Sequence, residues 1–131
     1  MRSQEQGLEM KKLLLASAVL LVAGSAFAAP VKTVKTDKGD VLAGENGMTL
    51  YTFKKDTAGV SNCYDQCATN WPPLTAAAGD AASGDYTVID RKDGTKQWAK
   101  GGMPLYYWVK DTKEGDTTGD GVGGNWDLAR P

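Results

Sequence analysis

An internal duplication constrains the fold of this chain more than any other feature. Shifting the sequence by 55 positions places residues 47–57 over residues 102–112 without a gap. The match continues to Asn70-Trp71, which aligns with Asn125-Trp126. Repeated units bury their apolar faces against each other, so each copy is expected to need the other for a complete core. Features kept in both copies are expected to be scaffold, whereas a feature of one copy is where a distinct activity would reside.

The N-terminal segment has the pattern of an export signal. A basic pair precedes an apolar run over residues 13–23, which is too short to span a bilayer. The triplet that ends at Ala28 matches the small-x-small cleavage rule. We therefore expect residues 1–28 to be a signal peptide, with 1–9 an upstream mis-start, and an exported protein of the periplasm or extracellular space without a membrane span or lipid anchor.

The rest of the chain, residues 29–131, is predicted to be one small domain. It would hold two repeats, at about 31–73 and 86–128, joined by a flexible and exposed linker over 74–85 that is rich in Ala, Gly and Ser. A formal net charge of −1 indicates no nucleic-acid partner. The sequence has no histidine, which excludes Ser-His and Cys-His nucleophile pairs, an imidazole base and the usual zinc or copper ligand sets.

Each copy is predicted to form a three-stranded meander followed by a long loop. The expected strands are 31–36, 41–43 and 49–53 in the first copy, and 86–90, 95–99 and 104–109 in the second. Glycines fall at matching turn positions, and Asn46-Gly47 is the strongest hairpin signal. Residues 63–70 suit a short helical turn before Pro72-Pro73. The predicted class is therefore mostly β, with two tandem meanders related by a pseudo-twofold axis, Gly-rich loops and little helix.

The third strand of each copy carries the pattern Tyr-x-aromatic-x-x-Asp. The motif residues are Tyr51, Phe53, Asp56, Tyr106, Trp108 and Asp111. Residues two apart on a strand share a face, so the two aromatic side chains of each motif point the same way. One interpretation is a repeated aromatic core pair with the Asp capping a turn. The other is an exposed aromatic platform for a sugar or a peptide.

The double motif resembles the family of secreted repeat proteins and predicted lipoproteins named for Yx(F/W/Y)xxD. The resemblance extends to the run 61–73 and to the run 115–121, and it covers nearly all of the predicted mature chain. It implies tandem repeats on an extracytoplasmic protein, and no established biochemical function. Two positions depart from the family pattern. The chain has no Cys after the signal, and Asp127 stands where relatives have His.

The two cysteines, Cys63 and Cys67, belong to the first copy alone. Their spacing allows a bridge across a helical turn or tight loop, and an oxidising compartment favours a disulfide. Thr118 and Val122 stand at the corresponding positions of the second copy. A redox-active pair and a metal–thiolate site are the alternatives.

The loop over residues 111–125 alternates oxygen donors with glycine. Asp111, Asp116 and Asp120 could supply carboxylates to a calcium ion, although their spacing differs from that of an EF-hand loop. The alternative is a Gly-rich loop whose Asp and Thr side chains bond to their own backbone. No other cofactor is predicted.

Four tryptophans complete the candidate set. Trp71 and Trp126 are repeat equivalents and are predicted to pack near the pseudo-twofold axis. Trp98 aligns with Ala43, so it is a candidate for either a surface contact or burial under the linker.

No nucleophile–base pair, phosphate loop or cofactor motif is visible, so we do not predict an enzyme. The leading hypothesis is a non-catalytic extracytoplasmic module that binds a protein, a glycan or an envelope component. The alternative is an envelope redox or metal-handling protein that uses Cys63 and Cys67 or the acidic loop. A third hypothesis is a hydrolase in which Asp56 and Asp111 act as acid and base.

Overall fold

A computed structural model describes residues 29–131, and the predicted signal peptide lies outside this range. Strands predominate, helix α2 is short, and within these residues no helix is long and apolar enough to cross a membrane. The elements are β1 (Val31–Thr36), β2 (Gly39–Gly44), β3 (Tyr51–Phe53), α2 (Gln66–Asn70), β4 (Thr75–Ala76), β5 (Tyr86–Asp90), β6 (Lys96–Lys100), β7 (Met103–Pro104), the 3₁₀ turn η2 (Val122–Gly124) and β8 (Trp126–Leu128).

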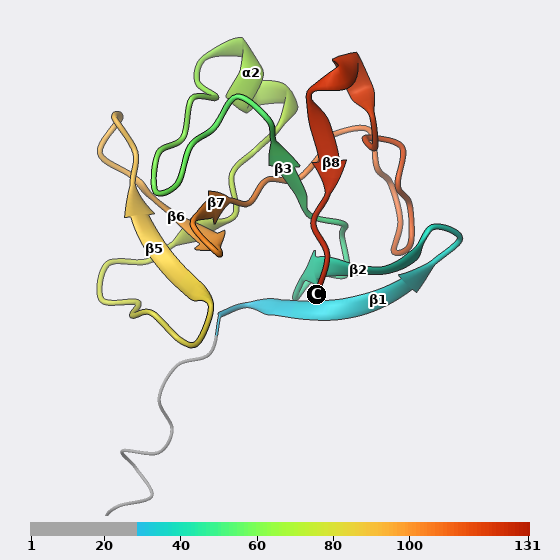
Figure 1. Cartoon of the computed structure of the whole chain (residues 1–131), viewed down its shortest axis with the longest axis horizontal. Coiled ribbons are helices and arrows are strands. Elements are labelled where there is room, and N and C mark those ends of the chain that lie inside the picture. Colours follow the sequence, from blue (N-terminus) through green and yellow to red (C-terminus); the bar gives the residue numbers. More distant parts are fainter. Residues whose placement is uncertain (1–28) are drawn as a thin grey trace, which may run out of the picture.

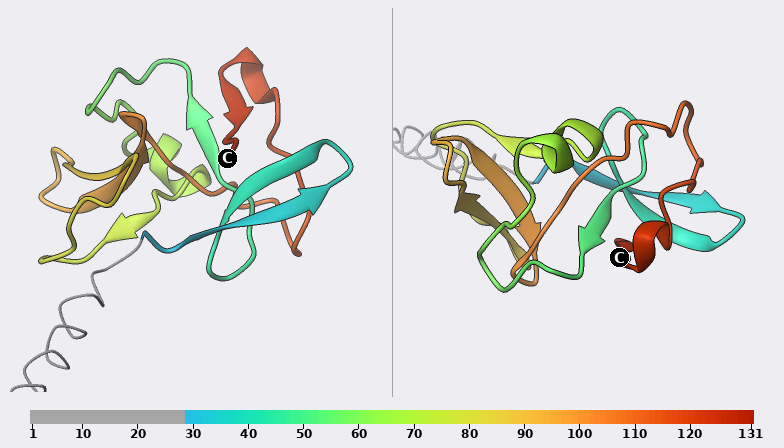
Figure 2. Two further views of the ribbon diagram at one scale, coloured as in Figure 1. Left: turned by 60° about the horizontal axis from the view of Figure 1, so that its bottom comes forward. Right: turned by 90° about the horizontal axis from the view of Figure 1, so that it is seen from above.

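Each repeat begins with an antiparallel hairpin, and the two hairpins lie at opposite ends of the molecule (Figures 1 and 2). In the first repeat β1 pairs with β2, and in the second β5 pairs with β6. Strands β7 and β4 both pair with the edge of β6 opposite β5, β7 at the end of β6 and β4 at its start. The predicted mostly β class with two tandem repeats is confirmed.

The repeats are joined through their third segments. Strand β3 of the first repeat pairs with β8 at the end of the second, and these strands run side by side in the middle of the molecule (Figure 1). The two motif tyrosines also pair directly. Tyr51 N donates to Tyr106 O at 2.8 Å, and Tyr106 N donates to Tyr51 O at 3.0 Å. This reciprocal pair relates the two repeats by a local twofold, because each tyrosine makes the bond that the other makes.

In the second strand of each repeat, the residues that occupy matching places in the structure are 56 positions apart, one more than in the ungapped sequence alignment. Val31 pairs with Gly44 where Tyr86, its equivalent, pairs with Lys100. The β5–β6 turn is longer than the β1–β2 turn, which moves β6 forward by one position. Gly44 and Lys100 therefore occupy matching places. By the same shift Trp98 matches a leucine, Leu42, and not Ala43 as the ungapped alignment suggests.

A column of four stacked rings fills the core between the repeats, and successive rings come from alternate copies. In order they are Phe53, Trp126, Trp71 and Trp108, with centroid separations of 4.3, 3.7 and 4.0 Å. Trp71 and Trp126 lie at the centre with an interplanar angle of 3°. Their predicted packing near the pseudo-twofold axis is confirmed.

The motif tyrosines close the sides of this column. Tyr51 meets Trp71 edge-on at 5.4 Å, and Tyr106 meets Trp126 edge-on at 5.2 Å. Both tyrosines are completely buried. Each stacked or edge-on pair contributes about 0.5–1.5 kcal/mol beyond its buried area. The motif aromatics are thus core residues, with Trp108 half-buried at one end of the column.

A second apolar cluster lies on the other face of the central strands. It consists of Leu42, Leu50, Leu74, Trp98, Leu105 and Ala129. Trp98 is buried here and is not a surface residue. The prediction of an exposed linker over residues 74–85 is wrong at its start, because Leu74 is buried and strand β4 follows it directly. The reason is that Leu74 N donates to Leu105 O and Leu74 O accepts from Trp98 N, so the end of the first repeat is fixed to the second.

We expect Trp126→Ala to lower the free energy of unfolding by about 3–5 kcal/mol, because it removes a ring stacked on both faces in the core. Trp126→Phe keeps a ring in the column and should cost less. Val109→Ala, at a residue that is 49% exposed, is the control and should change stability by less than about 0.5 kcal/mol. Urea denaturation measures all three, and equal losses for Trp126→Ala and Val109→Ala would contradict the central role of the column.

Candidate functional site

The motif aspartates bond to the tyrosines of the opposite repeat. Tyr51 Oη donates to Asp111 Oδ2 at 2.6 Å, and Tyr106 Oη donates to Asp56 Oδ2 at 2.7 Å. Both carboxylates are buried. Each motif is therefore completed only by its counterpart, and its polar groups are occupied inside the protein.

Burial has clear electrostatic effects on this crossed arrangement. It raises the pKa of the Asp56 carboxyl, although hydrogen bonds from Tyr106 and Asn62 and the charge of Arg91 act in the opposite direction. Burial also raises the pKa of the Tyr51 and Tyr106 phenols. The two tyrosines consequently keep their protons and act as donors.

Arg91 forms a buried polar cluster on one side of the axis. Its Nη1 donates to Ser61 Oγ at 2.9 Å and to Gln97 Oε1 at 2.8 Å. Its Nη2 donates to Cys63 O at 2.8 Å, and the guanidinium carbon lies 4.4 Å from the centre of the Tyr64 ring. Ser61 Oγ is also 2.6 Å from the hydroxyl of the second motif tyrosine. The cluster thus ties the cysteine loop of the first repeat to the second hairpin.

The symmetry-related place has no such cluster in the described residues, because Thr36 stands at the position of Arg91 and Gly119 at that of Tyr64. A Cβ built on Gly119 would lie 2.9 Å from both Trp71 and Tyr51, so a side chain there would displace the core rings. The Gly119 amide also donates to Tyr51 Oη at 3.1 Å. The two loops therefore differ at this position. Tyr64 places its ring over Arg91, whereas Gly119 lets the backbone of its loop approach Tyr51 and Trp71.

The predicted disulfide between Cys63 and Cys67 is confirmed. Cys63 is completely buried and Cys67 is half-buried at the start of α2. The Cys67 carbonyl accepts from Trp71 N at 2.7 Å, so the bridged loop leads directly into the ring column.

The three aspartates predicted as calcium ligands have separate environments. Asp111 belongs to the crossed motif, Asp120 lies 3.4 Å from Lys38 Nζ, and Asp116 accepts from Lys113 Nζ at 2.8 Å. That Lys113 bond, together with backbone donors, holds the pKa of Asp116 well below its ordinary value. Among residues 29–131, no three acidic, cysteine or histidine side chains are grouped to hold a metal ion.

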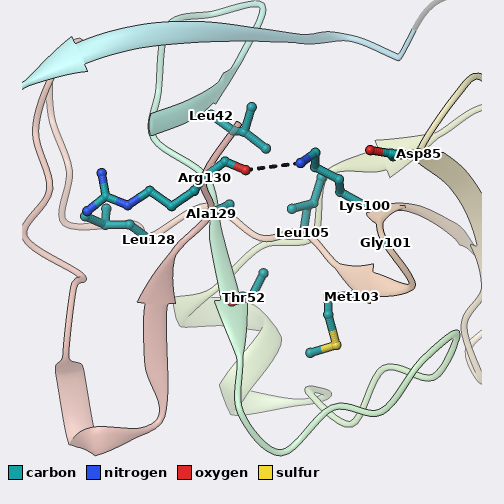
Figure 3. Close-up of a pocket in the computed structure, with 10 residues that line it drawn as sticks. All are labelled: Leu42, Thr52, Asp85, Lys100, Gly101, Met103, Leu105, Leu128, Ala129 and Arg130. Carbon is teal, nitrogen blue, oxygen red and sulfur yellow. Dashed lines mark hydrogen bonds between the residues drawn. The ribbon is translucent and has the colours of Figure 1, made fainter. Parts of the chain in front are cut away.

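A pocket of about 310 Å³ lies where both repeats meet, on the leucine face of the central strands. The residues that line it are Leu42, Thr52, Asp85, Lys100, Gly101, Met103, Leu105, Leu128, Ala129 and Arg130, and Figure 3 shows their arrangement. The apolar floor is formed by buried leucines and Ala129, whereas the charged residues stand at the rim. Its size falls at the lower end of the range for small-molecule sites.

The pocket is present in one half because small residues replace two large ones. Leu42 and Thr52 line it, while the matching places of the other half hold Trp98 and Tyr107. Tyr107 reaches so close to Gly44 that a side chain at Gly44 would overlap with its hydroxyl group. The symmetry-related place therefore holds aromatic rings, and the pocket exists at only one of the two places, where residues of both repeats line it.

The charged groups at the rim are not equivalent. Arg130 Nη1 donates to Lys38 O at 2.8 Å and to Asp40 O at 2.9 Å, so its guanidinium is bound to the first hairpin. Lys100 Nζ donates to Arg130 O at 3.3 Å, which holds the ammonium at the pocket (Figure 3). Asp85 is exposed on the same rim. The site therefore combines an apolar floor with one positioned ammonium.

Sequence analysis did not identify the Arg91 cluster or the pocket. One signal was present, since the aligned motifs already differ at Thr52 and Tyr107. The pairing of Leu42 with Trp98 could not be read from the alignment, because it depends on the one-residue shift in the second strand.

The two repeats of the structure coincide with two matches to one family model. The matches cover residues 32–75 and 87–130, and the family is described as a secreted repeat of unknown function. The chain belongs to this family, as its motifs predict, and is an exported two-repeat protein. No curated protein and no solved structure matched the chain.

We expect the buried Asp56 to make stability depend on pH. Its pKa is raised in the folded protein, so the folded state binds a proton more tightly than the unfolded state. The free energy of unfolding, relative to that of Asp56→Asn, should therefore fall as pH rises from about 4, the ordinary pKa of aspartate, through the raised value. Urea titrations at several pH values measure this slope. Asp37→Asn, at an exposed turn residue, controls for the loss of one charge, and a difference that stays constant or rises would contradict the assignment.

We expect the double change Cys63→Ala with Cys67→Ala to lower the free energy of unfolding by about 2 kcal/mol, the chain-entropy value for so short a loop. Guanidinium denaturation compares it with the oxidised protein. The single change Gln66→Ala, at an exposed residue between the cysteines, serves as the control. An unchanged midpoint in the double variant would mean that Arg91 and Trp71 hold the loop without the bridge.

Proposed function

We propose that this exported protein is a non-catalytic binding module of the periplasm or extracellular space, and that the pocket between its repeats is the binding site. The observation that carries the proposal is the asymmetry of the pocket. A duplicated scaffold with an open site in one half and aromatic rings in the other has a space that the core does not require.

The use of the motif residues supports a binding role over a catalytic one. The two carboxylates that might act as acid and base lie on opposite sides of the twofold, and each is bonded to a buried tyrosine. A general acid or base must reach the proton that it transfers. Asp56 and Asp111 are instead occupied in joining the repeats, so their repetition is explained by the fold.

The composition of the pocket also suits ligand binding. Small-molecule sites are concave and mostly apolar, with a few polar groups that fix orientation. Here Leu42, Leu105 and Ala129 provide a buried apolar surface, and Thr52 and Lys100 provide polar atoms at its edge.

We expect Thr52→Tyr to abolish binding of a neutral apolar probe, 1-octanol, because it introduces the ring that closes the other half. Amide shifts in ¹H–¹⁵N spectra, followed during the titration, report binding at Gly101, Met103 and Ala129. Thr33→Tyr, on the exposed face of β1, is the matched control and should bind as the wild type does. Shifts that persist in Thr52→Tyr, or that lie away from the pocket, would contradict the proposal.

A further inference from the structure

We infer that the pocket takes a small amphiphilic monoanion of about ten non-hydrogen atoms, with an apolar body and a single carboxylate that pairs with Lys100. This inference rests on the proposed function, and it adds the chemical class of the ligand. It follows from the size of the pocket, the burial of its floor and the positions of the charges at its rim.

The size and floor of the pocket define the apolar part of the ligand. A volume of about 310 Å³ accommodates about ten non-hydrogen atoms at roughly 30 Å³ each, the share of one water in the liquid. Leu42, Leu105, Leu128 and Ala129 line the pocket and are each less than 9% exposed, so the packing around them holds these apolar side chains in place. A short alkyl chain or a single ring matches this surface.

Lys100 defines the charge of the ligand. The Arg130 carbonyl takes one of the donors of its ammonium group, which leaves two for a ligand. In the described part of the chain, no carboxylate lies within 4.0 Å of Lys100 Nζ, whereas Lys96 and Lys113 each have an aspartate partner. An anion in the pocket would supply the counter-charge that Lys100 lacks.

The other rim charges favour a single negative charge over a phosphate dianion. Arginine binds phosphate in a bidentate manner, but the Arg130 side chain extends away from Lys100 (Figure 3), and its Nη1 is bound to two backbone carbonyls of the first hairpin. The two cations therefore do not converge on one anionic group. Asp85 places a negative charge on the same rim and would repel a second negative charge on the ligand (Figure 3).

The duplication supports the same assignment. Lys100 occupies the place of Gly44, where the ring of Tyr107 excludes any side chain. Of the two symmetry-related places, the one that has the pocket therefore also has the ammonium, and the other has neither. The first repeat supplies Leu42 and Thr52 there and the second supplies Lys100, as expected for parts of one site.

The test compares three probes of nearly equal size: octanoate, 1-octanol and octylammonium, each titrated into the full domain and followed by amide shifts. We expect octanoate to bind about ten-fold more tightly than 1-octanol, the effect of about 1.4 kcal/mol from a charge-assisted hydrogen bond, and octylammonium to bind more weakly than both. In Lys100→Gln the preference for octanoate should disappear while 1-octanol still binds. Lys100→Arg should retain the preference, and Lys55→Gln, at an exposed lysine outside the pocket, is the matched control.

The outcomes separate the ligand class from the binding role. Equal binding of octanoate and 1-octanol, or a preference that survives in Lys100→Gln, would overturn the monoanion assignment and leave the pocket as a binding site. Absence of pocket shifts with all three probes would overturn both the monoanion assignment and the binding role. A dispersed amide spectrum of the wild type shows that the protein is folded in this experiment. If octylammonium binds most tightly, Asp85 and not Lys100 pairs with the charged group of the ligand, and the inference is overturned.

Discussion

The structure depends on one exchange, in which the tyrosine of each repeat donates a hydrogen bond to the aspartate of the other. Burying a carboxylate is costly unless its oxygens accept hydrogen bonds, and the opposite tyrosine supplies the bond to Oδ2 while the aspartate's own loop supplies the bond to Oδ1. The reciprocal backbone pair of Tyr51 and Tyr106 lies at the same place, and the stacked rings continue from it in both directions. The Tyr-x-aromatic-x-x-Asp motif therefore pairs the two copies. Its tyrosine lies at the twofold axis, and its second aromatic residue lies at the end of the ring column.

The copies differ in the loops that pack beside this axis and on the opposite face. The first repeat has a bridged loop whose carbonyl and hydroxyl groups bond to Arg91, and the second has a glycine that lets its loop approach the rings. On the opposite face, Leu42 and Thr52 leave a pocket that Trp98 and Tyr107 fill in the other half. The Tyr–Asp exchange is the same in both directions, so the pairing of the repeats is kept although the loops and the pocket differ.

The duplication, the hairpins, the disulfide and the central tryptophan pair were all predictable, because they rest on periodicity, turn glycines and residue type. The crossed Tyr–Asp bonds were not, since the sequence shows two identical motifs and does not say that each is completed by the other. Arg91 was overlooked because an arginine beside Asp93-Gly94 is typical of an exposed turn, and its burial depends on acceptors from a loop thirty residues earlier, at Ser61. The pocket required the shift between β2 and β6, which arises from turn length and is invisible in an ungapped alignment.

The alternation of rings from the two repeats also determines when the core can be completed during synthesis. Phe53 and Trp71 emerge first in synthesis, yet the rings that separate and cover them belong to the C-terminal half. The N-terminal half thus has no finished core to collapse around, unlike a domain that folds as it leaves the ribosome. The ring column can therefore close only once β8 and its Trp126 have paired with β3, so the last strand to be synthesised is also the one that completes the core of the first repeat.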